Sequence, residues 1–125
     1  MRKLIMAMAM LAVLVGAVRA ADELDMDLMQ TIEDTNKSLS SNIALKNVKG
    51  STDDAKELET LFAKVENHFV AKGDAPDAVD LSRKSKDLAT AIVKAVGSQQ
   101  FEAATDSATE ISRACRSCHT FYKKS

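Results

Sequence analysis

The clearest folding signal of this 125-residue chain is the stretch from Asp53 to Lys72, which reads DDAKELETLFAKVENHFVAK. Its large apolar residues recur at spacings of three and four, which is the period of a helix with one buried face. They are Leu58, Phe62, Val65 and Phe69. Ser51 or Thr52 can cap the start of this helix, and Gly73 directly after it is a typical stop.

Three further segments with the same pattern surround this helix. The breaks between the four segments are single glycines: Gly50, Gly73 and Gly97. We predict a first helix from about Leu24 to Lys49 and a fourth from about Gln99 onward. The third helix is expected to be capped by Asp74 and to carry Pro76 in its first turn. The inward stripes of these three helices are Met29, Ile32, Asn36, Leu39 and Ile43; Leu81, Ser85, Leu88, Ile92 and Ala95; and Phe101, Ala104, Ala108, Ile111, Cys115, Cys118 and Tyr122.

Four amphipathic helices of similar length with short connections pack as antiparallel neighbours. No alternating strand pattern is present, so the predicted fold is all-α, an up-down-up-down four-helix bundle. The expected core is light, because most inward positions of the fourth helix are Ala or Cys. A large cofactor beside this helix is one physical reason for such a thin core, and tight helix packing is the alternative.

The N-terminal residues 1–20 have a separate character. Arg2 and Lys3 precede an apolar run of 15 residues, and Val18-Arg19-Ala20 resembles a cleavage site. These are the parts of a secretory signal peptide, and the run is short for a helix that spans a bilayer. We therefore expect cleavage after Ala20, a mature domain over residues 21–125, export, and no stable membrane insertion of the mature chain.

The charge of the mature chain limits its partners. Loss of residues 1–20 leaves 14 basic and 18 acidic residues, a net charge of −4. Nucleic-acid binding needs a concentrated basic face, which this chain lacks. The charge instead favours protein partners with basic docking surfaces.

The residues that carry chemistry are Cys115-Arg116-Ser117-Cys118-His119. This is the CxxCH pattern of covalent c-type haem attachment. Positions i, i+3 and i+4 of a helix share a face, so two thiols can bond the haem vinyl groups while the adjacent imidazole reaches the iron. We predict one haem c per chain, tethered by Cys115 and Cys118, with His119 as the proximal iron ligand.

Other chemistries of CxxC are weaker explanations. A thiol redox motif is expected in a βαβ setting, whereas this one ends a helical chain. A zinc site needs a fourth ligand, and the only other histidine, His68, lies far away in the sequence. We interpret His68 as a partly exposed residue of the second helix. A Cys115–Cys118 disulfide in a haem-free helical module remains the alternative from another functional class.

The whole mature chain resembles the class II c-type cytochromes, which include cytochrome c′ and its low-spin relatives. Members are exported four-helix bundles with CxxCH near the end of the fourth helix, followed by an aromatic and a basic residue. Here that segment reads His119-Thr120-Phe121-Tyr122-Lys123. The resemblance implies that Tyr122 and Lys123 lie on the proximal side of the haem and that the protein is periplasmic, in a Gram-negative bacterium. The resemblance also implies a homodimer that forms through the first two helices.

In this family the sixth iron position is supplied by the first helix. Methionine at that position occupies the sixth coordination site and suits electron transfer, whereas an apolar residue leaves the site open to NO or CO. Met29 lies on the inward stripe and is our predicted distal ligand, with Met26 as the second choice. The family often has Arg one turn before the distal residue, near a haem propionate. This chain has Asp25 at that position, so the propionate has no assigned partner and Lys37 is only a weak candidate.

The expected function is therefore one-electron transfer between protein redox partners. A five-coordinate, gas-binding cytochrome c′ is the alternative. No acid, base or nucleophile constellation accompanies the motif, so we do not expect an enzyme. A short basic run, Arg83, Lys84 and Lys86, is interpreted as a solvated face, with a docking patch as the alternative.

Overall fold

The computed structural model describes residues 26–122 of the chain, with side chains for residues 26–120. This part consists of four helices and contains no strand: α1 (Met26–Ala44), α2 (Val48–Lys72), α3 (Pro76–Gly97) and α4 (Phe101–Tyr122). The predicted all-α class is confirmed for these residues. None of the four helices combines the length and the apolar character that a membrane crossing requires. The predicted signal peptide lies outside the described residues.

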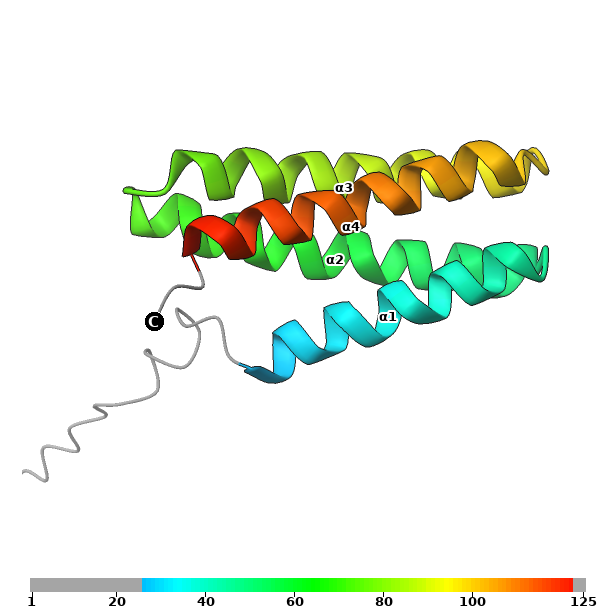
Figure 1. Ribbon diagram of the computed structural model, residues 1–125, viewed down its shortest axis with the longest axis horizontal. Helices are drawn as coiled ribbons and strands as arrows, with labels where there is room; N and C mark the ends of the chain where they lie inside the picture. The colour runs from blue at the N-terminus through cyan, green and yellow to red at the C-terminus, as the bar shows by residue number, and fades with distance from the viewer. Residues whose placement is uncertain (1–25, 123–125) are drawn as a thin grey trace, which may run out of the picture.

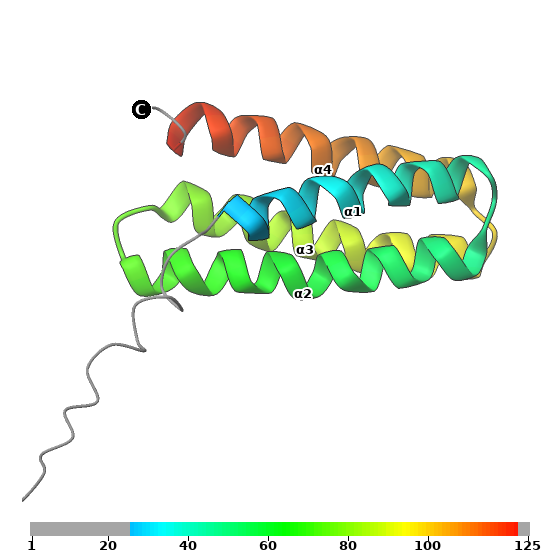
Figure 2. The same cartoon turned by 90° about the horizontal axis from the view of Figure 1, so that it is seen from below.

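The four helices lie side by side along their lengths (Figures 1 and 2). The start of α1 and the end of α4 lie at one end of the molecule, which we call the motif end. The turns between α1 and α2 and between α3 and α4 lie at the other, which we call the turn end. Packing is uneven, because α2 and α3 share the largest contact whereas α1 and α4 share the smallest of the four neighbouring pairs.

The core is built largely from the predicted stripes of the four helices. Its completely buried large side chains come from all four helices: Leu39, Leu58, Ile92, Ile111 and Val96. Of the five positions predicted for α3, Ser85, Ile92 and Ala95 are buried, whereas Leu81 and Leu88 are only half-buried. Ala78 and Ala89, which were not predicted, are also buried. Small residues at these positions allow the neighbouring helices to approach closely.

The predicted start of α2 was wrong. Gly50 does not break the chain but lies in the first turn of a helix that begins at Val48 and is capped by Asn47. The Asn47 side chain accepts a hydrogen bond from the Gly50 amide at 3.0 Å. A Cβ atom on Gly50 would lie 2.8 Å from side-chain atoms of Asn42 and Asn47. The glycine therefore permits close packing at this point, and α1 ends earlier than predicted, at Ala44.

The turn between α2 and α3 matches the prediction in part. α2 ends at Lys72, and Gly73 adopts a left-handed conformation with φ of 81°. Pro76 is the first residue of α3, where its missing N–H costs nothing. Asp74 does not cap α3, however. The cap position is Ala75, which has no side-chain hydrogen bond to offer.

The basic run of α3 is engaged in ion pairs. Arg83 Nε and Lys86 Nζ each lie 2.9 Å from a carboxylate oxygen of Glu66 on α2. Lys84 Nζ lies 3.7 Å from Glu110 on α4. These pairs join three helices, while the Arg83 and Lys84 side chains keep more than half of their surface exposed, as a solvated face predicts. The docking patch stays a prediction.

Candidate haem site

The CxxCH residues occupy the last turns of α4, at the motif end of the bundle. The Cys115 and Cys118 side chains are half-buried and pack against the hydrophobic core. His119 is exposed. Because Ser112, Cys115 and His119 are spaced by three and four residues, they share one face of α4.

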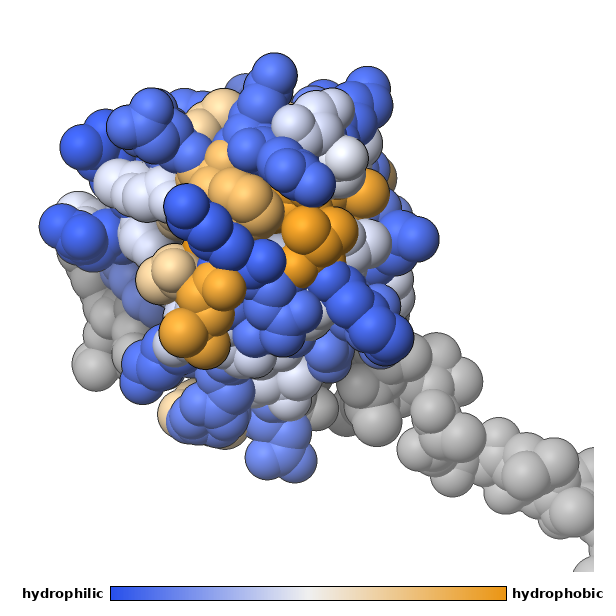
Figure 3. Space-filling model, turned by 90° about the vertical axis from the view of Figure 1, so that its right-hand side faces the viewer, coloured by the Kyte–Doolittle hydropathy of each residue, from blue (hydrophilic) through white to orange (hydrophobic). Residues whose placement is uncertain are grey.

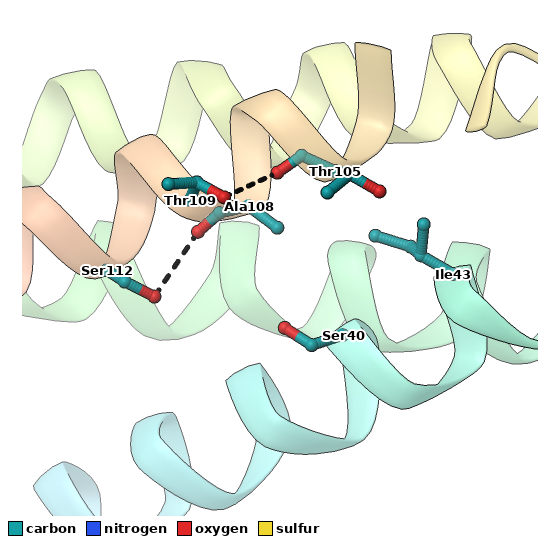
Figure 4. Close-up of a pocket in the computed structure, with 6 residues that line it drawn as sticks. All are labelled: Ser40, Ile43, Thr105, Ala108, Thr109 and Ser112. Atoms are coloured by element: carbon teal, nitrogen blue, oxygen red, sulfur yellow. Dashed lines mark hydrogen bonds between the residues drawn. The ribbon is translucent and has the colours of Figure 1, made fainter. Parts of the chain in front are cut away.

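That face of α4 lies against α1. Asn36 Nδ2 on α1 donates a hydrogen bond to Ser112 Oγ at 3.1 Å. Further toward the turn end, Ser40 and Ile43 of α1 lie across from Thr105 and Thr109 of α4 (Figure 4). Together with Ala108 and Ser112 they line a cavity of about 100 Å³. Later residues of α1 therefore meet earlier residues of α4, and the two helices run in opposite directions.

The hydrogen bond between Asn36 and Ser112 fixes which residues of α1 and α4 lie at the same level along the bundle axis. Met29 precedes Asn36 by seven residues, and His119 follows Ser112 by seven, which is about two helical turns in each case. Counting along both helices from the hydrogen bond brings Met29 and His119 to the same level of the bundle. Met29 is half-buried and packs against the core. Met26, the first residue of α1, has 77% of its surface exposed.

The two helices diverge where these residues lie. Both ribbon views show the start of α1 separating from the end of α4 toward the motif end (Figures 1 and 2). Around the midpoint they are held together by the hydrogen bond between Asn36 and Ser112. The Oδ1 atom of Asn36 is buried and has no hydrogen-bond partner among the described residues. The sequence pattern placed Asn36 on the inward stripe but did not predict its hydrogen bond to Ser112. A polar amide within an apolar stripe was the feature that could have indicated such a bond.

The thiols of the motif are shifted toward their protonated form. Burial raises the pKa of Cys115 to about 11, and the charges of Cys118 and, more weakly, Glu33 of α1 act in the same direction. Burial also raises the pKa of Cys118. Both residues are free thiols in the structure. Reactive thiol redox sites need a lowered pKa, so this environment does not favour thiol–disulfide catalysis.

The other residues singled out from the sequence lie away from this site or outside the described residues. His68 is half-buried on α2, and its ring packs edge-to-face on Phe69 with centroids 4.9 Å apart. This agrees with its interpretation as a partly exposed residue. Lys123 and the side chain of Tyr122 lie outside the described residues, so their predicted proximal roles stay predictions. Within residues 26–120, no three His, Cys, Asp or Glu side chains gather as a zinc ion would require.

The residues at the motif end fit a c-type haem by their chemistry. Two thiols and an imidazole follow one another on α4, and a thioether lies at the level of the imidazole on the facing helix. Comparison of the chain with models of protein families, with curated proteins and with solved structures gave no match.

Proposed function

We propose that residues 21–125 form a periplasmic, monohaem c-type cytochrome of class II that transfers single electrons between protein partners. The fold is then an up-down-up-down bundle that holds the haem between α1 and α4. The observation that carries this proposal is the level of Met29 opposite the CxxCH histidine, which follows from the hydrogen bond between Asn36 and Ser112.

Each residue of the site has a defined task in this proposal. Cys115 and Cys118 would hold the haem by thioether bonds, formed when each S–H adds across a vinyl group. His119 would hold the iron through its imidazole, and Met29 would hold it through its thioether sulfur. When bound, haem supplies a one-electron redox centre. Imidazole and thioether ligands in both oxidation states keep rearrangement small, as fast electron transfer requires.

Two properties of the helices support a cofactor at this place. Of the buried α4 residues that precede the motif, Ala104, Ala108 and Ala114 are small, and Ile111 is large. The start of α1 diverges from α4 at the motif end (Figure 1). Side chains alone therefore hold α1 to α4 less firmly here than elsewhere in the bundle, and a large planar group would supply the missing contacts.

Covalent haem attachment is tested by intact mass. The chain is produced in a host with a cytochrome c maturation system, alongside a Cys115→Ser, Cys118→Ser double variant. We expect the wild type to gain the mass of one haem under denaturing conditions and the double variant to gain none. A wild type that carries no haem and instead forms the Cys115–Cys118 disulfide would contradict the proposal and identify the haem-free module.

A further inference from the structure

Asn36 is the polar residue in the middle of the inward stripe of α1. Its apolar neighbours on that stripe, Ile32 and Leu39, are almost completely buried. The Oδ1 atom of Asn36 is buried as well and has no hydrogen-bond partner among the described residues. A buried oxygen without a partner costs free energy, and a leucine would fill a similar volume without that cost. Asn36 therefore serves something other than the stability of the core.

The amide of Asn36 connects α1 to α4 through two hydrogen bonds in series. Asn36 Nδ2 donates to Ser112 Oγ at 3.1 Å, and Ser112 Oγ donates to the Ala108 carbonyl oxygen at 3.3 Å. Because the Ser112 proton is used within α4, the lone pairs of its oxygen can accept from Asn36. Within residues 26–120, the bond from Asn36 to Ser112 is the only hydrogen bond between α1 and α4.

Toward the turn end, α1 is also held by α2. Ser38 Oγ and Asn42 Nδ2 donate to Asp54 Oδ2 at 2.7 and 2.8 Å. Figure 3 looks onto the turn end and shows hydrophilic residues around a hydrophobic middle. The second half of α1 therefore has polar contacts with α2 that do not depend on Asn36.

Toward the motif end, the polar side chains of α1 bond within the helix itself. Gln30 Nε2 donates to Asp34 Oδ1 at 3.0 Å. The other side-chain hydrogen bond and the ion pair of this part of α1 also stay within the helix. Among the described residues, Asn36 is thus the side chain nearest to Met29 that hydrogen-bonds α1 to another helix.

Asn36 and Met29 lie on the same face of α1, because seven residues are close to two full turns. The rotation of α1 that brings Asn36 to Ser112 therefore also turns Met29 toward α4. A slip of α1 by one turn would move Met29 by about 5.4 Å along the bundle, which is more than a bond to iron tolerates.

We propose that Asn36 is a positioning residue for the distal iron ligand. Its hydrogen bond to Ser112 holds α1 at the rotation and level that present the Met29 sulfur to the iron. This role rests on the proposed function, in which Met29 binds the iron. It explains why an amide with an unpartnered oxygen occupies a position that a leucine could fill.

Competition between imidazole and Met29 tests this role in the ferric, haem-loaded protein. Imidazole binds the iron only where the sulfur has left it, and its binding is followed by the loss of the far-red sulfur-to-iron band. We expect Asn36→Leu to raise the apparent affinity for imidazole about fivefold, the factor that one hydrogen bond of about 1 kcal/mol supplies. The same variant should keep or raise Tm, because the buried oxygen without a partner is removed.

Two further variants separate positioning from stability. Asn42→Ala is the matched control, since it removes the hydrogen bond from α1 to Asp54 on α2. It should lower Tm and leave the imidazole affinity at the wild-type value. Ser112→Ala removes the acceptor of Asn36 and should raise the affinity by a similar factor. The Asn36→Leu, Ser112→Ala double variant should show no additional rise, because both changes remove the same bond.

Thiol cross-linking tests the same role without haem. In the haem-free double cysteine variant, Met29→Cys and His119→Cys supply the only two thiols, which a bismaleimide can join. We expect Asn36→Leu to lower the fraction of cross-linked chains, because α1 is less firmly held at this level. Asn42→Ala should leave that fraction unchanged.

The results that contradict the positioning role differ from those that contradict the proposed function. If the wild type shows the far-red band and Asn36→Leu binds imidazole with the wild-type affinity, the positioning role alone is overturned. Equal rises in Asn36→Leu and Asn42→Ala would also overturn it, since they would reflect a general loss of stability. A wild type that carries no haem, or that lacks the far-red band, would overturn the proposed function and this role together.

Discussion

At the scale of single residues, the two methionines of α1 are chemically identical but differently placed. Met29 packs against the core at the level of His119, whereas Met26 is largely exposed at the first residue of the helix. A methionine on an inward stripe is usually a simple core residue. What distinguishes Met29 is its level relative to CxxCH, which the hydrogen bond between Asn36 and Ser112 defines.

Substitution of each methionine tests which of the two binds the iron. We expect Met29→Ala to convert the haem-loaded protein to high-spin iron that binds CO, because the distal sulfur is lost. The Met26→Ala variant is the matched control and should keep the wild-type spectrum. Optical spectra with and without CO measure both effects. If Met26→Ala alone opened the iron, the sulfur would have been assigned to the wrong residue.

At the scale of helices, the contact between α2 and α3 is secured by Glu66. Its carboxylate is largely buried and is bound by Lys86 and Arg83 of α3. The hydrogen bond from Lys86 lowers the pKa of Glu66 below its ordinary value of 4.5, with a smaller contribution from Arg83, and burial opposes both. Folding therefore favours the charged form of this group.

Substitution of Glu66 should weaken the bundle. Glu66→Gln is expected to cost about 1–2 kcal/mol of unfolding free energy at neutral pH, since both partners are partly exposed and screened by solvent. The exposed Glu57→Gln on the same helix is the control and should cost little. Urea unfolding of the haem-free double cysteine variant measures both differences.

The pH dependence of this stabilisation has a defined sign. A lowered pKa gives stability that is present above the ordinary glutamate pKa and is lost as the pH falls through the lowered value. The stability difference between wild type and Glu66→Gln should thus shrink as the pH is lowered below 4.5. A difference that stayed constant or grew toward acid pH would mean that the ion pairs are not its source.

The glycines of the turns provide a second matched pair. Gly73 has a φ of 81°, whereas Gly97 ends α3 with an ordinary φ and nothing within 4 Å of an added Cβ. We expect Gly73→Ala to lower stability by about 1 kcal/mol, because alanine is strained in the left-handed region. Gly97→Ala should leave Tm unchanged or slightly higher. Equal effects of the two substitutions, measured by thermal unfolding, would contradict this explanation.

Some helices were more predictable from the sequence than others, for physical reasons. The α2 stripe was predictable, because large apolar residues mark its buried face. The start of α2 was not, because Gly50 reads as a break unless its close approach to Asn42 and Asn47 is known. In α3 the buried residues are mainly Ala and Ser, which have no strong periodic signal. The partners of Glu66 depend on tertiary packing, which periodicity does not describe.

At the scale of the whole molecule, the bundle is unevenly held together. α2 and α3 form its firmest part. The second half of α1 meets α4 mainly through small and polar side chains, whereas the start of α1 diverges from α4. The CxxCH residues were recognisable from the sequence because their spacing is itself the signal. The level of Met29 was not, because it depends on how α1 and α4 are aligned in space.

Haem attachment should therefore stabilise the protein chiefly through α1. Compared with the Cys115→Ser, Cys118→Ser variant, the haem-loaded wild type should gain at least about 1 kcal/mol, or roughly 4–8 °C in Tm. Hydrogen exchange should show the largest gain of protection in the first half of α1. A gain spread evenly over α2 and α3 would indicate that the group does not lie between α1 and α4.

The central claim is a haem iron closed by His119 and Met29, and the optical spectrum of the matured protein tests it most directly. Spectra are recorded in the ferric and ferrous states, with and without CO. We predict a low-spin spectrum with a weak far-red sulfur-to-iron band in the ferric state and no change on addition of CO. A high-spin spectrum that shifts with CO would contradict the claim and indicate an open distal pocket that binds gases.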